Sequence, residues 1–303
     1  MRALILTLGP TAVVDVDYRE PAVTDTRNFE RFELELLGGS FERRYRKLRP
    51  EIEAMPWGTF VLAHYTQAQL IAARHAWTAA AFQEHRTGIA CCATLRALLE
   101  ARAPLDLTAV AARFPLDEIA HAEMCARLAM ELGGGTEIVY DPLDVVVDAP
   151  AGQSPLFRLC DLAVRFFCVG EALSIPLLRA IWHAACHPLP RAVLGRIVRD
   201  EAAHGTFGYA VLDWALPQLS PSEQAQLGPA ADRSIASVRK LWEGMASRAP
   251  RDACDADTLA FMETDAYLEL AARSMDDKVL RPLRARGLML QEFPDGARSV
   301  ARR

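Results

Sequence analysis

Two segments, each with an acidic pair followed by a histidine, are the part of this sequence best suited to chemistry. They span residues 117–121 and 200–204, and both read D-E-x-x-H within alanine-rich sequence of helical periodicity. Residues three apart on a helix share a face, so the Glu and the His of each segment project together. Burying a carboxylate and an imidazole is costly unless something compensates them, and a metal ion compensates both. The repeated segment therefore predicts metal ligands.

Each D-E-x-x-H segment follows a helical stretch that carries another glutamate. Glu84 lies 34 residues before Glu118, and Glu171 lies 30 residues before Glu201. Glu171 stands in an apolar stretch, where a lone carboxylate needs a partner. For Glu84 the alternative is an ordinary glutamate on the helix surface. The six candidate ligands are Glu84, Glu118, His121, Glu171, Glu201 and His204.

The charge of this set favours two metal ions. Two divalent ions would balance four carboxylates and two neutral imidazoles, which leaves the site close to neutral inside a low-dielectric bundle. Oxygen ligands with two imidazoles suit iron or manganese better than thiophilic metals. We expect Asp117 and Asp200 to accept the free N–H of a ligand histidine, either their own or that of the other segment. No catalytic residue beyond the ligands and no site for an organic cofactor is predicted.

Helical periodicity predicts the elements that position these residues. Helices are expected at about 66–100, 107–132, 155–185 and 190–216, with Pro115 kinking the second and Pro176 opening the third. The glycines at 133–135 end the second helix. The connection over 136–153 is long enough to carry the chain from one end of a four-helix bundle to the other.

The ends of the chain are expected to differ from its centre. Residues 4–8 and 13–18 alternate like two strands joined by a Gly-Pro turn, and amphipathic helices are expected near 222–247 and 256–285. The predicted fold class is all-α: a four-helix bundle with a long crossover, extra C-terminal helices and a short N-terminal β-hairpin. Within one domain, the regions are 1–56 (hairpin and connector), 57–220 (di-metal bundle) and 221–303 (C-terminal helices packing on the bundle).

The composition excludes several classes of protein. A net charge of −5 argues against a nucleic-acid binder, which needs a basic surface. Charged residues interrupt every apolar run before the ~18 residues of a membrane span, and residues 2–8 are too short for a signal sequence. The 7 cysteines form no C-x-x-C pair, which argues against a zinc ribbon, a rubredoxin module or a disulfide framework. We expect a cytoplasmic protein with neither nucleic-acid nor membrane partners.

With this ligand pattern, residues 66–216 resemble the ferritin-like di-iron carboxylate superfamily. The paired D-E-x-x-H segments are similar to those of methane monooxygenase hydroxylases and acyl-carrier-protein desaturases, and the six-ligand spacing resembles p-aminobenzoate N-oxygenases. The resemblance implies that the six residues hold two iron ions, or a manganese–iron pair. In that superfamily the reduced centre activates O2 and oxidises an organic substrate or iron itself.

The sequence also departs from individual members of that superfamily. Ile197 stands where the N-oxygenases have a seventh ligand, a histidine, which argues against arylamine N-oxygenation. Cys125 stands where ribonucleotide reductase small subunits have a radical tyrosine, which disfavours a stable tyrosyl radical. Ser174 is one position short of the threonine that hydroxylases use in proton handling. The desaturases usually lack an N-terminal hairpin like the one predicted here.

The leading hypothesis is a non-haem di-iron oxidase or oxygenase that takes O2 and a small organic substrate. No flavin, nicotinamide or Fe–S motif is recognisable, so electrons would come from an external ferredoxin or reductase, and a homodimer is compatible with the sequence. The alternative is a ferroxidase, iron-handling or peroxide-scavenging ferritin-like protein, and a third is a non-catalytic helical scaffold. Gly88, Ala172 and Gly205 near the ligands would leave room for a substrate or, alternatively, let helices pack closely.

Overall fold

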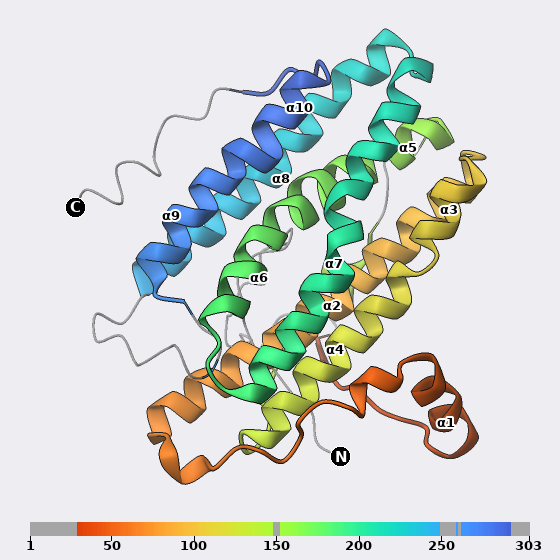
Figure 1. The fold of residues 1–303 in the computed structure, drawn as a ribbon. Helices are drawn as coiled ribbons and strands as arrows, with labels where there is room; N and C mark the ends of the chain where they lie inside the picture. The colour runs from red at the N-terminus through yellow and green to blue at the C-terminus, as the bar shows by residue number, and fades with distance from the viewer. Residues whose placement is uncertain (1–28, 148–151, 249–258, 260–261, 292–303) are drawn as a thin grey trace.

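The computed structural model describes residues 29–147, 152–248, 259 and 262–291, and over these ranges the protein is mostly helical (Figure 1). This confirms the predicted all-α class. The only strands in the described ranges form a small antiparallel sheet of two short strands. The hairpin predicted over residues 4–8 and 13–18 lies outside the described residues.

Four helical segments surround the predicted ligands. They are α2 (Gln67–Glu100), α4 (Phe114–Glu131), a continuous helix made of α5 (Pro155–Leu162), a π-helix (Ala163–Glu171) and α6 (Ala172–Ala184), and α7 (Pro188–Ala215). Figure 1 shows α2 lying along α4 and α6 lying along α7. Because α4 also contacts α7, the two pairs enclose one common interior. Large apolar side chains such as Trp77, Met124 and Leu173 fill it.

The connection between α4 and α5 crosses the length of the bundle. The short helix α3 (Leu105–Ala111) joins α2 to α4 at one end, so these two helices run in opposite directions. At the other end, Arg74 near the start of α2 donates its Nε–H to the carbonyl of Gly134, just after α4, at 2.6 Å. The next helix starts back at the first end, where Arg158 pairs with Glu100 at 2.5 Å. At 1.5 Å per residue, α2 spans about 39 Å between these two contacts.

Pro115 lies at the start of a helix and does not bend one. The predicted helix over 107–132 is divided, because α3 ends at Ala111 and α4 begins at Phe114 with Pro115 in its first turn. A proline in a first turn lacks only an N–H that would have no partner inside the helix. The predicted kink at Pro115 was therefore wrong. In the same way α7 begins at Pro188, two residues before the predicted Pro190.

The third helical segment is irregular next to a predicted ligand. Its middle part, Ala163–Glu171, is a π-helix, a wider turn that is rare in proteins and occurs frequently at functional sites. Glu171 is the last residue of the π-helix, and Pro176 follows inside α6. The irregular part therefore lies on the N-terminal side of Pro176, the residue at which the sequence predicted a local opening.

The segment before α2 is ordered against the bundle. Strand β1 (Glu30–Arg31) pairs with β2 (Val139–Tyr140) of the crossover connection. Helix α1 (Gly39–Leu48) follows, and Arg46 within it donates to Glu123 of α4 at 2.5 Å. This segment reads as a polar connector in the sequence, yet it packs directly beside the helix that carries the first D-E-x-x-H segment.

The C-terminal helices cover the other side of the bundle (Figure 1). Helix α8 (Pro221–Arg248) contacts the π-helix Ala163–Glu171, and α9 (Thr264–Ser274) contacts α6. A second π-helix (Met275–Leu280) and α10 (Arg281–Ala285) continue α9. In the part of the chain that the structure describes, none of the helices has both the length and the apolar character needed to cross a membrane.

Candidate metal centre

The six predicted ligands meet in one buried cluster between the helices. Glu84 comes from α2, Glu118 and His121 from α4, Glu171 from the end of the π-helix, and Glu201 and His204 from α7. Five of them are 0–3% exposed, and the Glu84 side chain keeps 15%. The alternative reading of Glu84 as a surface glutamate therefore does not hold, because the side chain points inward to the other ligands.

The ligand atoms form two overlapping groups, each with three carboxylates and one imidazole. Position 1 consists of Glu84, Glu118, His121 and Glu201, and position 2 consists of Glu118, Glu171, Glu201 and His204. Within each group, one donor atom per residue lies within 4.8 Å of every other. An octahedral ion with bonds of about 2.1 Å holds its donor atoms roughly 3–4 Å apart. Both groups therefore have the donor atoms and the spacing to hold a metal ion.

Glu118 and Glu201 each turn one oxygen toward each histidine. For Glu118, Oε2 lies 3.5 Å from Nδ1 of His121, and Oε1 lies 3.0 Å from Nδ1 of His204. For Glu201, Oε1 lies 3.3 Å from Nδ1 of His121, and Oε2 lies 3.0 Å from Nδ1 of His204. These two carboxylates are thus oriented to bridge the two positions, while Glu84 and Glu171 each serve one position.

Four potential metal-ligating atoms of this cluster are buried without a hydrogen-bond partner among the described residues. They are Oε2 of Glu118, Oε2 of Glu201, Nδ1 of His121 and Nδ1 of His204. A buried polar atom that lacks a hydrogen bond costs free energy, so four of them converging in one interior need a common explanation. A divalent ion at each position would provide it, so the residues fit a pair of metal ions.

The electrostatics of the cluster lead to the same interpretation. Burial, together with the neighbouring carboxylates of Glu118 and Glu201, raises the pKa of Glu84 to about 8 and that of Glu171 well above its usual value. Burial would lower the pKa of His121, but the carboxylates of Asp200 and the ligand glutamates, which favour the protonated ring, outweigh it and raise that pKa. Glu84, Glu171 and His121 thus retain protons until another cation replaces them, whereas the two histidines outweigh burial and lower the pKa of Glu201.

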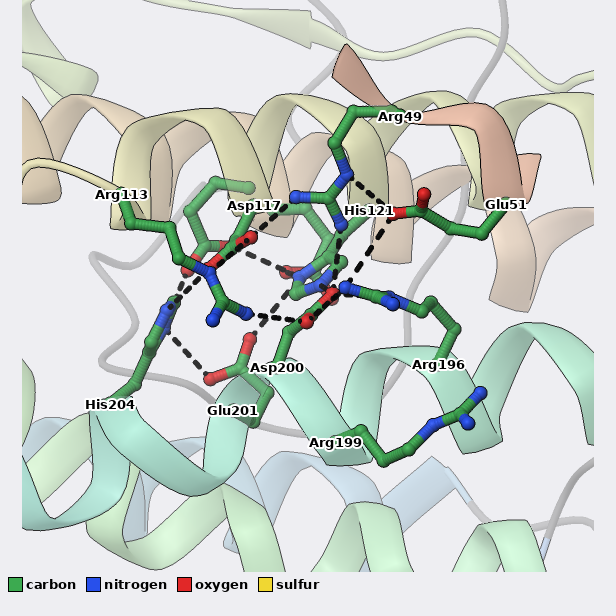
Figure 2. A network of polar contacts seen from close by, with 12 residues as sticks. Arg49, Glu51, Arg113, Asp117, His121, Arg196, Arg199, Asp200, Glu201 and His204 are labelled. Carbon is green, nitrogen blue, oxygen red and sulfur yellow. Dashed lines mark hydrogen bonds and ion pairs between the residues drawn. The ribbon is translucent and has the colours of Figure 1, made fainter. Parts of the chain in front are cut away.

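The two aspartates contact the histidines crosswise. Nε2 of His121 lies 3.3 Å from Oδ2 of Asp200, and Nε2 of His204 lies 3.6 Å from Oδ2 of Asp117 (Figure 2). Of the two alternatives that the sequence left open, the structure selects the histidine of the other segment. The hydrogen bond between Nε2 of His121 and Asp200 keeps the proton on that nitrogen and leaves the lone pair of Nδ1 facing the ligand cluster.

Three arginines contact the two aspartates and were not predicted from the sequence. Arg113 and Arg196 lie four residues before Asp117 and Asp200, so the repeat is in fact R-x-x-x-D-E-x-x-H, a signal that could have revealed them. Arg113 donates to Oδ1 of both Asp117 and Asp200, at 3.2 Å and 2.7 Å, and Arg196 donates to Asp200 at 2.7 Å. Arg49 also reaches both aspartates, from the segment after α1 (Figure 2). No local pattern around Arg49 indicates this role.

The two glycines near the ligands differ in how closely their neighbours approach. A Cβ atom on Gly205 would lie 2.1 Å from Cδ1 of Ile175, and one on Gly88 would lie 3.4 Å from Cβ of Glu118. At Gly205 the close-packing alternative therefore holds, whereas an added methyl group at Gly88 would make only an ordinary contact. On the side of position 2, the ring of Phe114 lies 4.0 Å from the ring of His204 and contacts Phe207.

No protein-family model and no curated protein matches this chain. The functional argument therefore depends on the site and on the fold around it.

Proposed function

We propose that this protein is a ferritin-like, non-haem di-iron oxidase or oxygenase that uses O2 to oxidise a small organic substrate. The observation that carries the proposal is the pair of ligand groups that share Glu118 and Glu201. Two adjacent positions bridged by two carboxylates differ from an ordinary buried salt-bridge cluster, in which each acidic side chain finds its own cation.

The arrangement of the helices supports a ferritin-like bundle. One glutamate comes from each of two helices, and a Glu-x-x-His pair comes from each of the other two, as in ferritin-like di-iron and di-manganese carboxylate proteins. The long crossover between the second and third helical segments is also a feature of that fold. Oxygen and imidazole donors favour iron, with a manganese–iron pair as the variant that the same ligands tolerate.

Each ligand has a distinct task in this proposal. Glu118 and Glu201 would each serve both ions, and Glu84 and Glu171 would each serve one. Asp200 holds the proton of His121 on Nε2 and so keeps Nδ1 available. When bound, the iron pair supplies the redox chemistry and the activation of O2, which no protein side chain provides.

The protein contributes a dry environment around the ligands. His121 and His204 are 0% exposed, and Phe114, Phe167 and Phe207 pack together beside His204. Exclusion of water protects reactive intermediates from side reactions. Since the sequence has no recognisable electron-carrier motif, we assign electron delivery to a separate ferredoxin or reductase.

The first experiment is the metal content per chain. After anaerobic loading with Fe(II) and desalting, elemental analysis should give two irons per chain, with one bound at each position. One iron or none would contradict the six-residue assignment and, with it, the oxidase or oxygenase proposal.

A second measurement separates organic oxidation from iron handling. Protein loaded with two irons per chain is mixed with O2 in the presence of excess Fe(II), and the oxidised iron is counted. In the proposed oxidase, oxidation should stop close to the bound iron unless an organic substrate and an electron donor are added. Continued turnover of the excess Fe(II) to ferric iron would instead identify a ferroxidase.

A further inference from the structure

Arg49 is an unusual residue for the segment in which it lies. It follows α1, whose own residues are all at least partly exposed, yet Arg49 is only 3% exposed. Its guanidinium group lies between the two crossed aspartates (Figure 2). One Nη bonds to Asp117, the other bonds to Oδ2 of Asp200 at 2.9 Å, and Nε bonds to Glu51 at 2.7 Å.

The other arginines at these aspartates differ from Arg49 in exposure. Arg113 also bonds to both aspartates, but its side chain is 55% exposed, and Arg196 reaches only Asp200 of the pair. The Arg49 side chain is 4% exposed and bridges Asp117 and Asp200, whose side chains are 1% and 2% exposed. A charged contact that excludes water is screened less than an exposed one and holds its geometry more firmly.

A short chain of contacts leads from Arg49 to the ligands. Oδ2 of Asp200 accepts from Arg49 and also lies 3.3 Å from Nε2 of His121. On the other side, Asp117 accepts from Arg49 and faces Nε2 of His204 at 3.6 Å. The planar guanidinium fork can hold two carboxylates at once in a fixed relation, which an ammonium group cannot do.

We propose that Arg49 is a positioning residue for the metal centre: it fixes both aspartates, and through them both ligand histidines. Docking of residues 39–57 on the bundle thereby becomes part of metal binding. This inference rests on the proposed function, because it takes the two histidines to be ligands. It adds a role for the segment before α2, which lies outside the four helices that supply the ligands.

Thermodynamic linkage makes the proposal reciprocal. If docking of residues 39–57 raises the metal affinity, then metal binding must stabilise the docked segment by the same factor. Metal loading should therefore slow amide hydrogen exchange in residues 39–57, although none of these residues is among the predicted ligands.

The test compares wild type with Arg49→Gln, Arg49→Lys and Arg46→Gln. Co(II) serves as the metal, since its absorption spectrum reports both affinity and ligand geometry. Arg46→Gln is the matched control, because Arg46 anchors the same segment through Glu123 and has no contact with the two aspartates among the described residues. Arg49→Lys keeps the buried cation if the glutamine variant fails to fold.

We expect Arg49→Gln to weaken Co(II) binding by about 10–100-fold, the range typical of groups that orient metal ligands. Arg49→Lys should restore the fold but leave the affinity low and the Co(II) spectrum altered. Arg46→Gln, which loosens the segment but removes no contact to the two aspartates, should lose much less affinity than Arg49→Gln. In the wild type alone, and not in Arg49→Gln, Co(II) should slow hydrogen exchange of residues 39–57.

The outcomes separate the two proposals. If the wild type binds Co(II) tightly and the Arg49 variants bind equally well, the positioning role is overturned and the metal centre stands. Equal losses in Arg46→Gln and Arg49→Gln would also overturn it, since docking alone would then explain the effect. If the wild type itself binds no Co(II), the proposed function fails, and the role of Arg49 fails with it.

Discussion

The two halves of the candidate metal centre carry the same sequence motif on different backbones. In the half formed by α2 and α4, Glu84 projects from a regular α-helix and its side chain keeps 15% exposure. In the half formed by the π-helix and α7, Glu171 ends an irregular helix and is 3% exposed. The motif thus determines which residues point into the cluster. The geometry of the helix that carries the additional glutamate determines how far that glutamate is exposed to solvent.

The halves also differ in how closely their helices approach. A Cβ atom on Gly88 of α2 would meet its neighbour at an ordinary 3.4 Å. A Cβ atom on Gly208 of α7 would lie 2.7 Å from both Sγ of Cys168 and Cβ of Phe167, and 2.9 Å from the backbone nitrogen of Cys168. The half that contains the π-helix is therefore packed more tightly and has less freedom to adjust.

The largest expected effect separates shared from unshared ligands. Glu118→Ala removes a ligand from both positions and should reduce Fe(II) loading from two ions per chain to none. Glu84→Ala removes a ligand from position 1 alone and should leave about one ion, bound at position 2. Elemental analysis of desalted protein measures both variants. If Glu118→Ala retained one ion, Glu118 would not bridge, and the two positions would be independent.

Packing gives the next largest effect. Gly208→Ala should destabilise the protein by about 3 kcal/mol, because the new methyl group would overlap both side chain and backbone of the π-helix. Gly88→Ala is the matched control in the other half. Alanine gains up to about 1 kcal/mol over glycine within a helix, so this variant should be neutral or slightly more stable. Urea unfolding measures the stability of both variants. Similar losses of stability in the two would contradict the inferred difference in packing between the halves.

The sequence could predict which Glu and His side chains lie together because their arrangement within each segment is local. The spacing of Glu118 and His121 fixes a common helix face regardless of the rest of the fold. Which histidine each aspartate faces depends on how α4 packs on α7, and no short-range pattern contains that information. The π-helix had a partial local signal in Pro176, whereas the contacts of Arg49 join residues 68 and 151 positions apart in the chain.

The third prediction concerns the crossed aspartates. Asp200 hydrogen-bonds to His121 at 3.3 Å, whereas Oδ2 of Asp117 and Nε2 of His204 have no hydrogen-bond partner among the described residues. Asp200→Asn should therefore weaken metal binding at position 1 by about 10–100-fold. Asp117→Asn should weaken position 2 by a smaller factor. Competition titrations against a chelator measure both affinities, and unchanged iron retention in the Asp200 variant would reject its role in orienting the histidine.

The last prediction uses pH to examine the more exposed half. Burial and nearby carboxylates raise the pKa of Glu84 to about 8 in the metal-free protein, compared with 4.5 for an unperturbed glutamate. Between these two values the folded state binds more protons than the unfolded state, so stability must fall as the pH rises. The slope for one such group is at most about 1.4 kcal/mol per pH unit, and it vanishes below the lower value and above the higher one.

Glu84→Gln isolates this contribution, because glutamine resembles the neutral acid and cannot ionise. With a chelator present, urea unfolding between pH 5 and pH 8 should show the wild type losing stability relative to Glu84→Gln as the pH rises. Glu35→Gln, which makes the same chemical change at an exposed site, should run parallel to the wild type. If the wild type and Glu84→Gln also ran parallel, Glu84 would be ionised in both folded and unfolded protein. The greater exposure of its half would then be enough to keep the carboxylate charged without a metal ion.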